Sequence, residues 1–328
     1  MRRRDFLGIL GSAAMAWPRA ARAQQTGNMK RIGVLFGGAE NEEGRGRLAA
    51  FNEGLRALGH TAGRDVEIDV RWAAGDNTKA QALAKELVSL KPDAIFSTAT
   101  VATRALKRAT TEIPIIFATV SDPVGDGLIA SLARPGGNIT GFTSFEFSLA
   151  SKWLDVLKEV APQTIRIAML FNPATAPGGG MSYVRIAEAA ARTSQIVAMP
   201  VGSVDDINRS MDQFAAQPNG GLIVVPDSFT NQNTELIVAA AARNRLPAVY
   251  PLRNFSTAGG LISYGVDGAV QARQAATYVD RILRGEKVSG LPVQAPNKFD
   301  LVINLRTAKT LGLSVPQTLQ VAADEVIE

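Results

Sequence analysis

The amino-acid sequence predicts an α/β protein made of two doubly wound parallel-sheet lobes, with a ligand cleft between the lobes and three chain crossings. Short apolar runs alternate with amphipathic stretches, which is the order of parallel sheets with helical crossovers. The run at 31–36 (RIGVLF) is echoed 135 residues later at 166–171 (RIAMLF). Two further echoes follow at offsets of 126 and 133 residues: 91–96 with 217–223, and 113–117 with 246–250. Three echoes in one order indicate two lobes of common architecture.

The first lobe is predicted to contain four strands and three helices. The strands are expected at 31–36, 66–72, 94–97 and 115–118, and the helices at 44–58, 77–90 and 100–110. Residues 66–72 alternate apolar and charged side chains, which indicates a half-exposed strand at a sheet edge. The other runs are continuously apolar, as strands covered on both faces are. Asp76 or Asn77 can cap the second helix, and Gly59 can end the first.

The second lobe is predicted to repeat this order before the chain crosses back. Its strands are expected at 165–171, 196–200, 222–226 and 248–250, and its helices near 182–193, 205–217 and 234–244. Residues 139–147 are interpreted as the first crossing. A strand at 260–264, a helix at 266–283 and a strand at 299–304 complete the pattern. We therefore expect one lobe from 29–144 plus 266–292, and the other from 145–265 plus 293–328.

Residues 1–23 carry the three parts of a secretory signal: a charged start, an apolar stretch and the cleavage pattern Ala21-Arg22-Ala23. The apolar stretch at 6–17 has 12 residues, whereas crossing a bilayer needs ~20. Paired arginines, then Phe-Leu and a weakly apolar region, are similar to a twin-arginine export signal. The alternative is a short amphipathic helix. We predict cleavage after Ala23 and a periplasmic location.

Charge and residue counts exclude several classes of function. The 328 residues carry 35 Lys+Arg and 30 Asp+Glu, and the predicted signal peptide holds five Arg and one Asp, which leaves 30 against 29. A net charge of about +1 gives no reason to expect nucleic-acid binding. The absence of Cys excludes disulfides, a thiol nucleophile and a lipid-anchored N-terminal Cys. The single histidine, His60, is expected to be solvated or capping, so no catalytic residue, metal site or cofactor is predicted.

Polar and aromatic side chains follow the predicted strands, where open parallel sheets bind ligands. The candidate ligand-binding residues are Ala39, Glu40, Thr98, Thr100, Thr119, Ser121, Asp122, Asn172, Asp227, Ser228, Tyr250, Tyr264 and Asp267. Thr98 and Thr100 begin a helix whose free N–H groups suit a carboxylate. Asp122 or Asp227 could pair with an ammonium group. For each Ser, Thr or Asp, capping alone is the alternative, and Phe36 and Phe171 are expected to pack in the cores.

Several stretches together resemble a family of ABC-importer substrate-binding proteins. They are 112–117 (EIPIIF), 121–125 (SDPVG), 131–141 (SLARPGGNITG), 246–250 (LPAVY), 260–265 (GLISYG), 300–304 (DLVIN) and a leader ending in Ala-Gln-Gln. The resemblance covers nearly the whole chain. It implies the type I periplasmic-binding-protein fold, with a cleft that closes on ligand, and a tryptophan- or aromatic-amino-acid-binding branch. Residues 176–180 (APGGG) depart from the pattern, because longer and often aromatic side chains are expected there.

The resemblance implies a periplasmic receptor that captures a small molecule, foremost an amino acid or a small or aromatic carboxylate. Such a receptor would be a monomer that delivers its ligand to an ABC permease and, through it, the ATPase, without performing chemistry. Two alternatives stay open: an exported ligand sensor feeding a signalling receptor, and an exported enzyme. A transcription regulator of the same fold is disfavoured, because the signal occupies the place of its DNA-binding domain.

Overall fold

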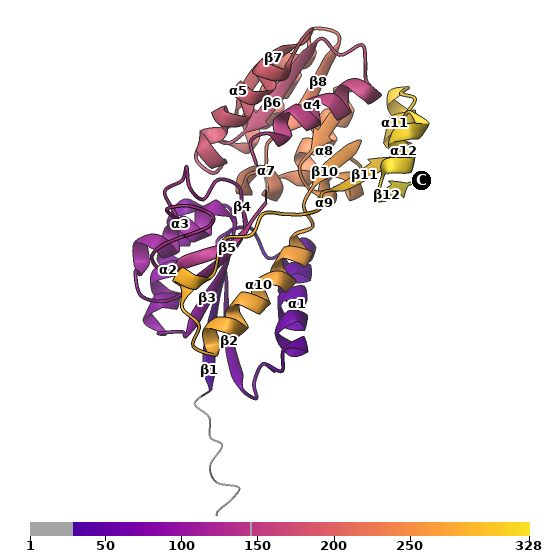
Figure 1. Cartoon of the computed structure of the whole chain (residues 1–328). Helices are drawn as coiled ribbons and strands as arrows, with labels where there is room; N and C mark the ends of the chain where they lie inside the picture. Colours follow the sequence, from indigo (N-terminus) through magenta and orange to yellow (C-terminus); the bar gives the residue numbers. More distant parts are fainter. Residues whose placement is uncertain (1–28, 145) are drawn as a thin grey trace, which may run out of the picture.

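The chain folds into two α/β lobes stacked along one long axis (Figure 1). The computed structural model describes residues 29–144 and 146–328, so the predicted signal peptide at 1–23 lies outside the described residues. Lobe 1 is built on a five-stranded sheet of order β2-β1-β3-β4-β5. Lobe 2 is built on a seven-stranded sheet of order β12-β11-β10-β9-β8-β6-β7. The predicted fold class of two parallel-dominated lobes is confirmed.

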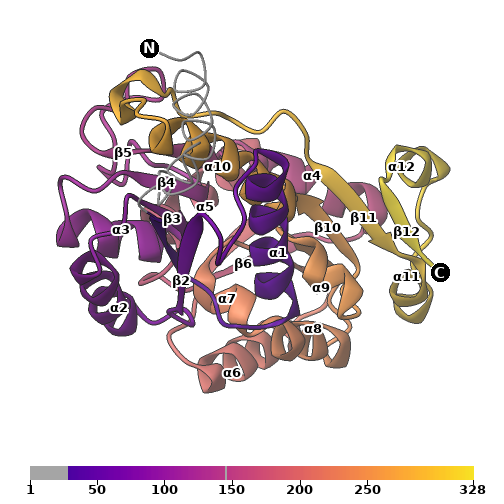
Figure 2. The same cartoon turned by 90° about the horizontal axis from the view of Figure 1, so that it is seen from below.

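Lobe 1 follows the predicted order of strands and helices. Its strands are β1 (Lys30–Phe36), β2 (Val66–Trp72), β3 (Ala94–Thr98), β4 (Ile115–Val120) and β5 (Ile139–Thr143), and its helices are α1 (Glu42–Ala57), α2 (Asn77–Ser89), α3 (Ala99–Ala109) and α10 (Gly268–Leu283). All strand pairs are parallel, and β2 lies at an edge as predicted. Helices α1 and α10 cover one face of the sheet and α2 and α3 the other (Figure 2).

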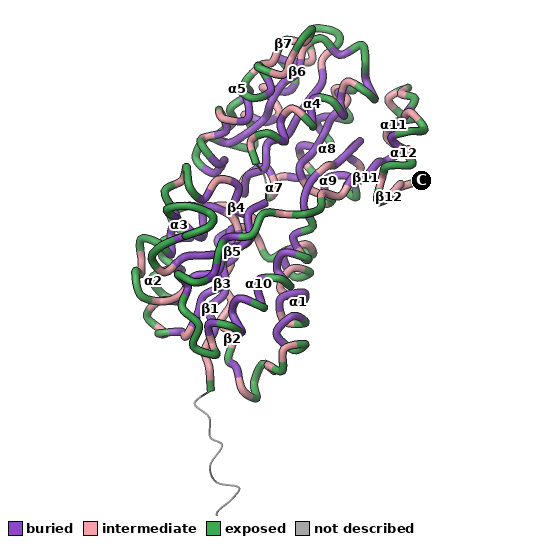
Figure 3. Tube along the Cα trace, viewed as in Figure 1, coloured by how far each residue is buried: buried purple, intermediate pink, exposed green. Residues whose placement is uncertain are grey.

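Alternating side chains of the central strands fill two cores. In β1, Ile32 and Val34 pack toward α1 and α10, whereas Leu35 packs toward α2 and α3. This alternation follows from the two-residue period of a strand. The central strands β1, β3 and β4 are buried along most of their length (Figure 3), which explains why their sequences are continuous apolar runs.

Lobe 2 repeats the design with a larger sheet. Its strands are β6 (Arg166–Phe171), β7 (Gln195–Pro200), β8 (Gly220–Val224), β9 (Ala248–Tyr250), β10 (Ile262–Gly265), β11 (Asp300–Asn304) and β12 (Glu325–Ile327). Its helices are α4 (Leu149–Val160), α5 (Met181–Ala190), α6 (Val204–Ala215), α7 (Ser228–Gln232), α8 (Thr234–Arg243), α9 (Arg253–Thr257), α11 (Leu305–Leu311) and α12 (Gln317–Ala322), with a 3-10 turn, η2 (Pro177–Gly180), before α5. Only the β10–β11 pair is antiparallel among the described strand pairs.

The chain passes between the lobes three times. It leaves β5 for α4, returns from β10 to α10, and leaves η3 (Val288–Gly290) for β11. The predicted start of the first crossing at residue 139 is wrong, because Ile139–Thr143 pairs with β4 as a buried strand. The third crossing bonds to β5, directly before the first crossing: Thr143 N donates to Gln294 O at 2.8 Å, and Gln294 N donates to Gly141 O at 3.0 Å.

Local side chains fix the ends of several helices. Asp76 caps α2, because its Oδ1 accepts from Thr78 N at 2.7 Å and Lys79 N at 3.0 Å. His60, expected to be solvated or capping, instead lies between two carboxylates. Its Nε2 is 2.8 Å from Asp280 Oδ1, and its Nδ1 is 3.3 Å from Asp65 Oδ2. These contacts tie the end of α1 to α10.

Candidate functional site

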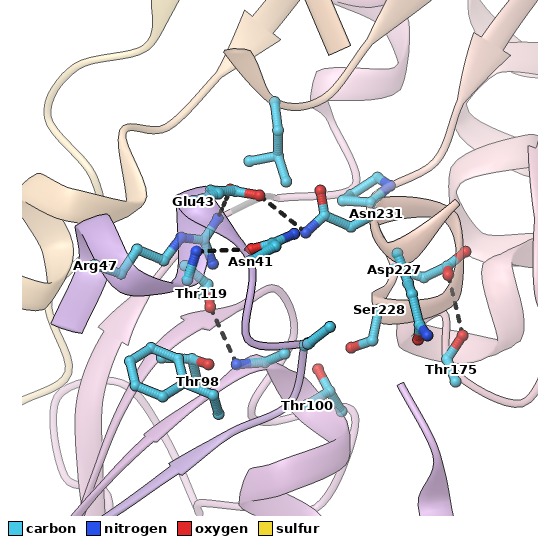
Figure 4. A pocket seen from close by; sticks show the side chains of 18 of the residues that line it. Asn41, Glu43, Arg47, Thr98, Thr100, Thr119, Thr175, Asp227, Ser228 and Asn231 are labelled. Carbon is cyan, nitrogen blue, oxygen red and sulfur yellow. Dashed lines mark hydrogen bonds and ion pairs between the residues drawn. The ribbon is translucent and has the colours of Figure 1, made fainter. Parts of the chain in front are cut away.

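A cavity lies between the lobes, at the carboxyl ends of strands from both sheets (Figure 4). The structure brings seven of the predicted residues to its wall: Ala39, Thr98, Thr100, Thr119, Ser121, Asp227 and Ser228. The hydroxyls of Thr100 and Ser228 point toward each other from opposite lobes (Figure 4). A ligand in this cavity would therefore contact both lobes.

The N-terminus of α3 forms the polar floor on the lobe 1 side. Its N-cap, Thr98, makes no side-chain cap hydrogen bond, so the N–H groups that follow Ala99 in the first turn are not capped by this residue. Ala99 and Thr119 both have φ in the left-handed region, at +65° and +56°, and Ala99 N donates to Thr119 Oγ1 at 3.1 Å. Such strain is costly outside glycine and persists where the surroundings impose it. The helix end is thus held open toward the cavity and can receive an anionic group.

Two stacked aromatic rings form an apolar wall beside this floor. Phe36 ends β1 and Trp72 ends β2, the two residues are in register, and their ring centroids are 4.1 Å apart with planes 13° from parallel. A Cβ on Gly44 would lie 2.7 Å from the Trp72 ring, so glycine lets this ring pack against α1. Phe36 is 2% exposed, as its predicted core placement requires, and still lines the cavity. The wall offers a flat surface for a planar apolar group.

A series of polar contacts, which begins with an ion pair in α1, crosses the cavity from α1 to α7. Glu43 pairs with Arg47 one turn along α1 and accepts a hydrogen bond from Asn231 Nδ2 of lobe 2 at 3.2 Å (Figure 4). Asn231 Oδ1 in turn accepts from Asn254 Nδ2 at 2.9 Å. Outside the cavity, Asn77 Nδ2 of α2 donates to the Ala174 carbonyl of lobe 2 at 3.2 Å. The lobes are therefore in direct contact around the cavity, which is a closed arrangement.

Asp227 anchors the lobe 2 side. Its Oδ2 accepts from Asn172 N at 3.0 Å, and its Oδ1 accepts from Thr175 Oγ1 at 3.0 Å and Thr230 N at 2.7 Å. Burial raises the pKa of this carboxyl to about 6, against these hydrogen bonds, which lower it. The carboxylate ties the loops after β6 and β8 together while lining the cavity, so its capping role and its place at the site coexist.

The glycine-rich turn before α5 is required by packing. A Cβ on Gly180 would lie 2.2 Å from the Phe171 ring, and Gly180 has φ of +81°. Thr175 and Pro177 of this segment line the cavity, and no long side chain enters it from residues 176–180. The departure noted in the sequence therefore leaves room on the lobe 2 side.

Six predicted residues do not line this cavity, and each has a physical reason. They are Glu40, Asp122, Asn172, Tyr250, Tyr264 and Asp267. Glu40 is exposed, and Asp122 Oδ1 accepts from Gly125 N in its own turn. Asn172 is buried beneath Asp227, with its side chain accepting from Ala174 N. Tyr250 is 1% exposed and stacks on Phe255 in the lobe 2 core.

The last two of the six, Tyr264 and Asp267, lie at the end of β10 and before α10. The Tyr264 ring packs 5.7 Å from Phe299, and its carbonyl accepts from Trp153 Nε1 at 2.8 Å. Asp267 caps α10 through Ala269 N at 2.7 Å and borders a second groove between the lobes, which adjoins the cavity at residues such as Glu43 and Asn231. Neither residue reaches the cavity.

Sequence reasoning missed several residues of the wall. They are Asn41, Glu43, Arg47, Trp72, Thr175, Pro177, Asn231, Gln232 and Leu252. A signal for Trp72 was present, because it is the last residue of a strand. Glu43 was missed because α1 begins at Glu42, before the predicted start at Gly44, and Arg47 because it lies within the predicted helix rather than in a loop after a strand. Asn231 and Gln232 lie in a helix of five residues, which periodicity cannot reveal.

Two classes of feature are absent from the described ranges. Across residues 29–144 and 146–328, no helix has the length and apolarity needed to cross a membrane. Over the same ranges, no group of three His, Asp or Glu side chains is arranged to hold a metal ion. The site is built from hydroxyls, amides, two aromatic rings and a few paired charges.

This chain is similar to known proteins in both sequence and fold. The model of the family of ABC transporter substrate-binding proteins matches residues 44–327. The tyrosine-binding protein of Clostridioides difficile is 26% identical over 264 residues, 80% of this chain and 75% of that protein. A conserved domain protein of Vibrio cholerae superposes with a TM-score of 0.84 at 26% identity, covering 91% of this chain and 99% of that one.

A Streptococcus pneumonia ABC domain in complex with L-Trp shares the fold, with a TM-score of 0.83 at 24% identity over 91% of this chain and 99% of that one. The matched family consists of solute-binding receptors rather than enzymes. Because the family model spans most of the sequence and both lobes, the chain belongs to the ABC transporter substrate-binding proteins.

Proposed function

We propose that the protein is an exported receptor that captures an aromatic amino acid in the interlobe cavity and delivers it to the permease of an ABC importer. The observation that carries this proposal is the pairing of a flat aromatic wall, Phe36 and Trp72, with the open N-terminus of α3 in one cavity. An aromatic ring suits the first and a carboxylate suits the second. The printed names of the C. difficile relative and the S. pneumonia complex support this ligand class.

The carboxylate of the ligand would lie at Thr100, with the hydroxyls of Ser121 and Ser228 close by. All three line the cavity, and Thr100 and Ser121 are buried, with exposed fractions of 4% and 8%. The ammonium group would face Asp227, where Oδ2 accepts a single protein hydrogen bond and has room for another. We propose these residues, with Phe36 and Trp72, as the ligand contacts.

Binding would stabilise the closed arrangement. A ligand that touches both lobes favours the closed state by its differential affinity for the two states. The closed form would then dock on a permease. Export through the predicted signal at 1–23 would place the receptor outside the cytoplasm. The receptor would bind and release its ligand without catalysing a reaction.

A thermal-shift screen tests this function. Purified protein is unfolded, washed and refolded to remove carried ligand, then scanned with each amino acid and with aromatic carboxylates. L-Trp or L-Tyr should raise the melting temperature, because a ligand at 100 times Kd stabilises the native form by about 2.7 kcal/mol. If none of these compounds shifts melting or binds by calorimetry, the proposed ligand class is wrong.

A further inference from the structure

The side-chain amide of Gln271 joins three segments of lobe 1. Gln271 lies in α10 and is 4% exposed. Its Oε1 accepts from the Thr119 backbone N–H at 3.1 Å and from the Ser144 hydroxyl at 2.8 Å, and its Nε2 donates to the Thr143 carbonyl at 2.5 Å. One buried side chain thus links the end of β4, the end of β5 and α10. Gln271 itself does not line the cavity.

An irregularity in β4 explains why Thr119 needs this partner. The pairing of β4 with β5 shifts register between Phe117 and Val120, so Thr119 lies where the ladder is interrupted. Thr119 has φ of +56°, and its N–H donates to Gln271 instead of to β5. A buried backbone donor must find an acceptor, and Gln271 supplies it.

Thr119 connects Gln271 to the candidate ligand site. Its Oγ1 accepts from Ala99 N at 3.1 Å, and Ala99 is the first residue of α3, with φ of +65°. Both residues line the cavity. Ala99 and Thr119 both have strained backbone conformations, which persist only where neighbouring groups hold them in place. Gln271 is the buried side chain that holds Thr119.

The other side of Gln271 faces the chain crossings. Thr143 and Ser144 are the last residues before the first crossing. Thr143 N also donates to Gln294 O of the third crossing, and α10 begins directly after the second. The amide of Gln271 therefore sits between the cavity floor and the segments about which the lobes must turn.

We propose that Gln271 is a positioning residue that couples the cavity floor to the interlobe hinge. It fixes the left-handed Thr119 at the mouth of α3 and pins Thr143 and Ser144 at the lobe 1 end of the first crossing. Removing its amide leaves the Thr119 N–H and the Thr143 carbonyl without this partner. The cavity floor at the N-terminus of α3 and the start of the first crossing should then both become more mobile.

The test measures the lobe separation in ligand-free protein, so it does not depend on the ligand proposed above. The chain has no Cys, and spin labels at Lys85→Cys on α2 and Glu188→Cys on α5, both exposed, report the distance between lobes. Gln271→Met keeps the side-chain length but removes the amide. Gln274→Met, at an exposed position of the same helix, is the matched control. The distance distribution should broaden in Gln271→Met and not in the control.

Two further measurements complete the test. Calorimetry with L-Trp as the probe should show a loss of affinity on the order of tenfold in Gln271→Met, while Gln274→Met binds as wild type. If Gln271→Met does not fold, Ser144→Ala removes one of the three bonds and should broaden the distribution to a smaller extent. A lower melting temperature with an unchanged distance distribution would make Gln271 merely structural and overturn the inference. Absent L-Trp binding in wild type would count against the proposed function alone.

Discussion

Asn231 of lobe 2 donates a hydrogen bond from Nδ2 to Glu43 Oε2 of lobe 1, at 3.2 Å across the cavity. Glu43 is oriented by its pairing with Arg47, and Asn231 by Asn254, so both partners are held in place before they meet. This bond can form only when the lobes are closed. It stabilises the closed state and so raises the apparent affinity, which scales with the fraction of the protein in the binding-competent state.

A bond outside the cavity tests that idea without touching the ligand. Asn77→Ala removes the interlobe hydrogen bond to the Ala174 carbonyl. A neutral hydrogen bond contributes about 0.5–1.5 kcal/mol, so L-Trp affinity by calorimetry should fall roughly two- to tenfold. Gln81→Ala, an exposed residue one turn along α2, is the control and should bind normally. Equal affinities in all three proteins would show that the bond has no part in closure.

Trp72 should determine the preference for aromatic ligands. Trp72→Leu removes the flat surface stacked on Phe36, and L-Trp affinity should fall on the order of tenfold or more, whereas Trp72→Phe should retain most of it. Calorimetry with L-Trp and L-Leu separates this effect from general damage, because the loss should be larger for L-Trp. An equal loss for both ligands would argue against stacking at this wall.

A negative charge at the mouth of α3 should repel the ligand carboxylate. Thr100 is the second residue of α3 and lines the cavity, so Thr100→Asp places an anion beside the first-turn N–H groups. L-Trp binding should be lost in this variant and largely kept in Thr100→Ser. Tryptamine, which lacks the carboxylate, should not lose affinity to Thr100→Asp. A parallel loss of both compounds would place the carboxylate elsewhere.

Asp227 should make stability depend on pH in a defined direction. Its folded-state pKa is raised from 3.8 to about 6, so the folded state favours the protonated acid. The stability from this group is fully present below pH ~4 and is lost as pH rises through ~6, by about 3 kcal/mol in order of magnitude. Chemical denaturation of wild type and Asp227→Asn between pH 4 and 7 measures it. The free energy of unfolding of wild type should fall relative to the variant, and a rise would contradict the assignment.

The sequence predicted the architecture better than the site. Apolar runs such as 31–36 identify buried strands because both faces of a parallel sheet are covered, and the structure has these strands at nearly the predicted bounds. Tyr250 shows the limit: a strand-end aromatic can face the core or the cleft, and only the packed lobe decides. Glu43 and Asn231 are 188 residues apart in sequence and meet through a contact between the lobes, which no local pattern encodes.

A crystal structure of the protein grown with L-Trp tests the central claim most directly. The account predicts an indole ring against Phe36 and Trp72, a carboxylate within hydrogen-bond distance of the first-turn N–H groups of α3, and an ammonium group facing Asp227. Density that placed the carboxylate at Arg47 with the ring away from Trp72, or a cavity left empty at saturating L-Trp, would contradict it.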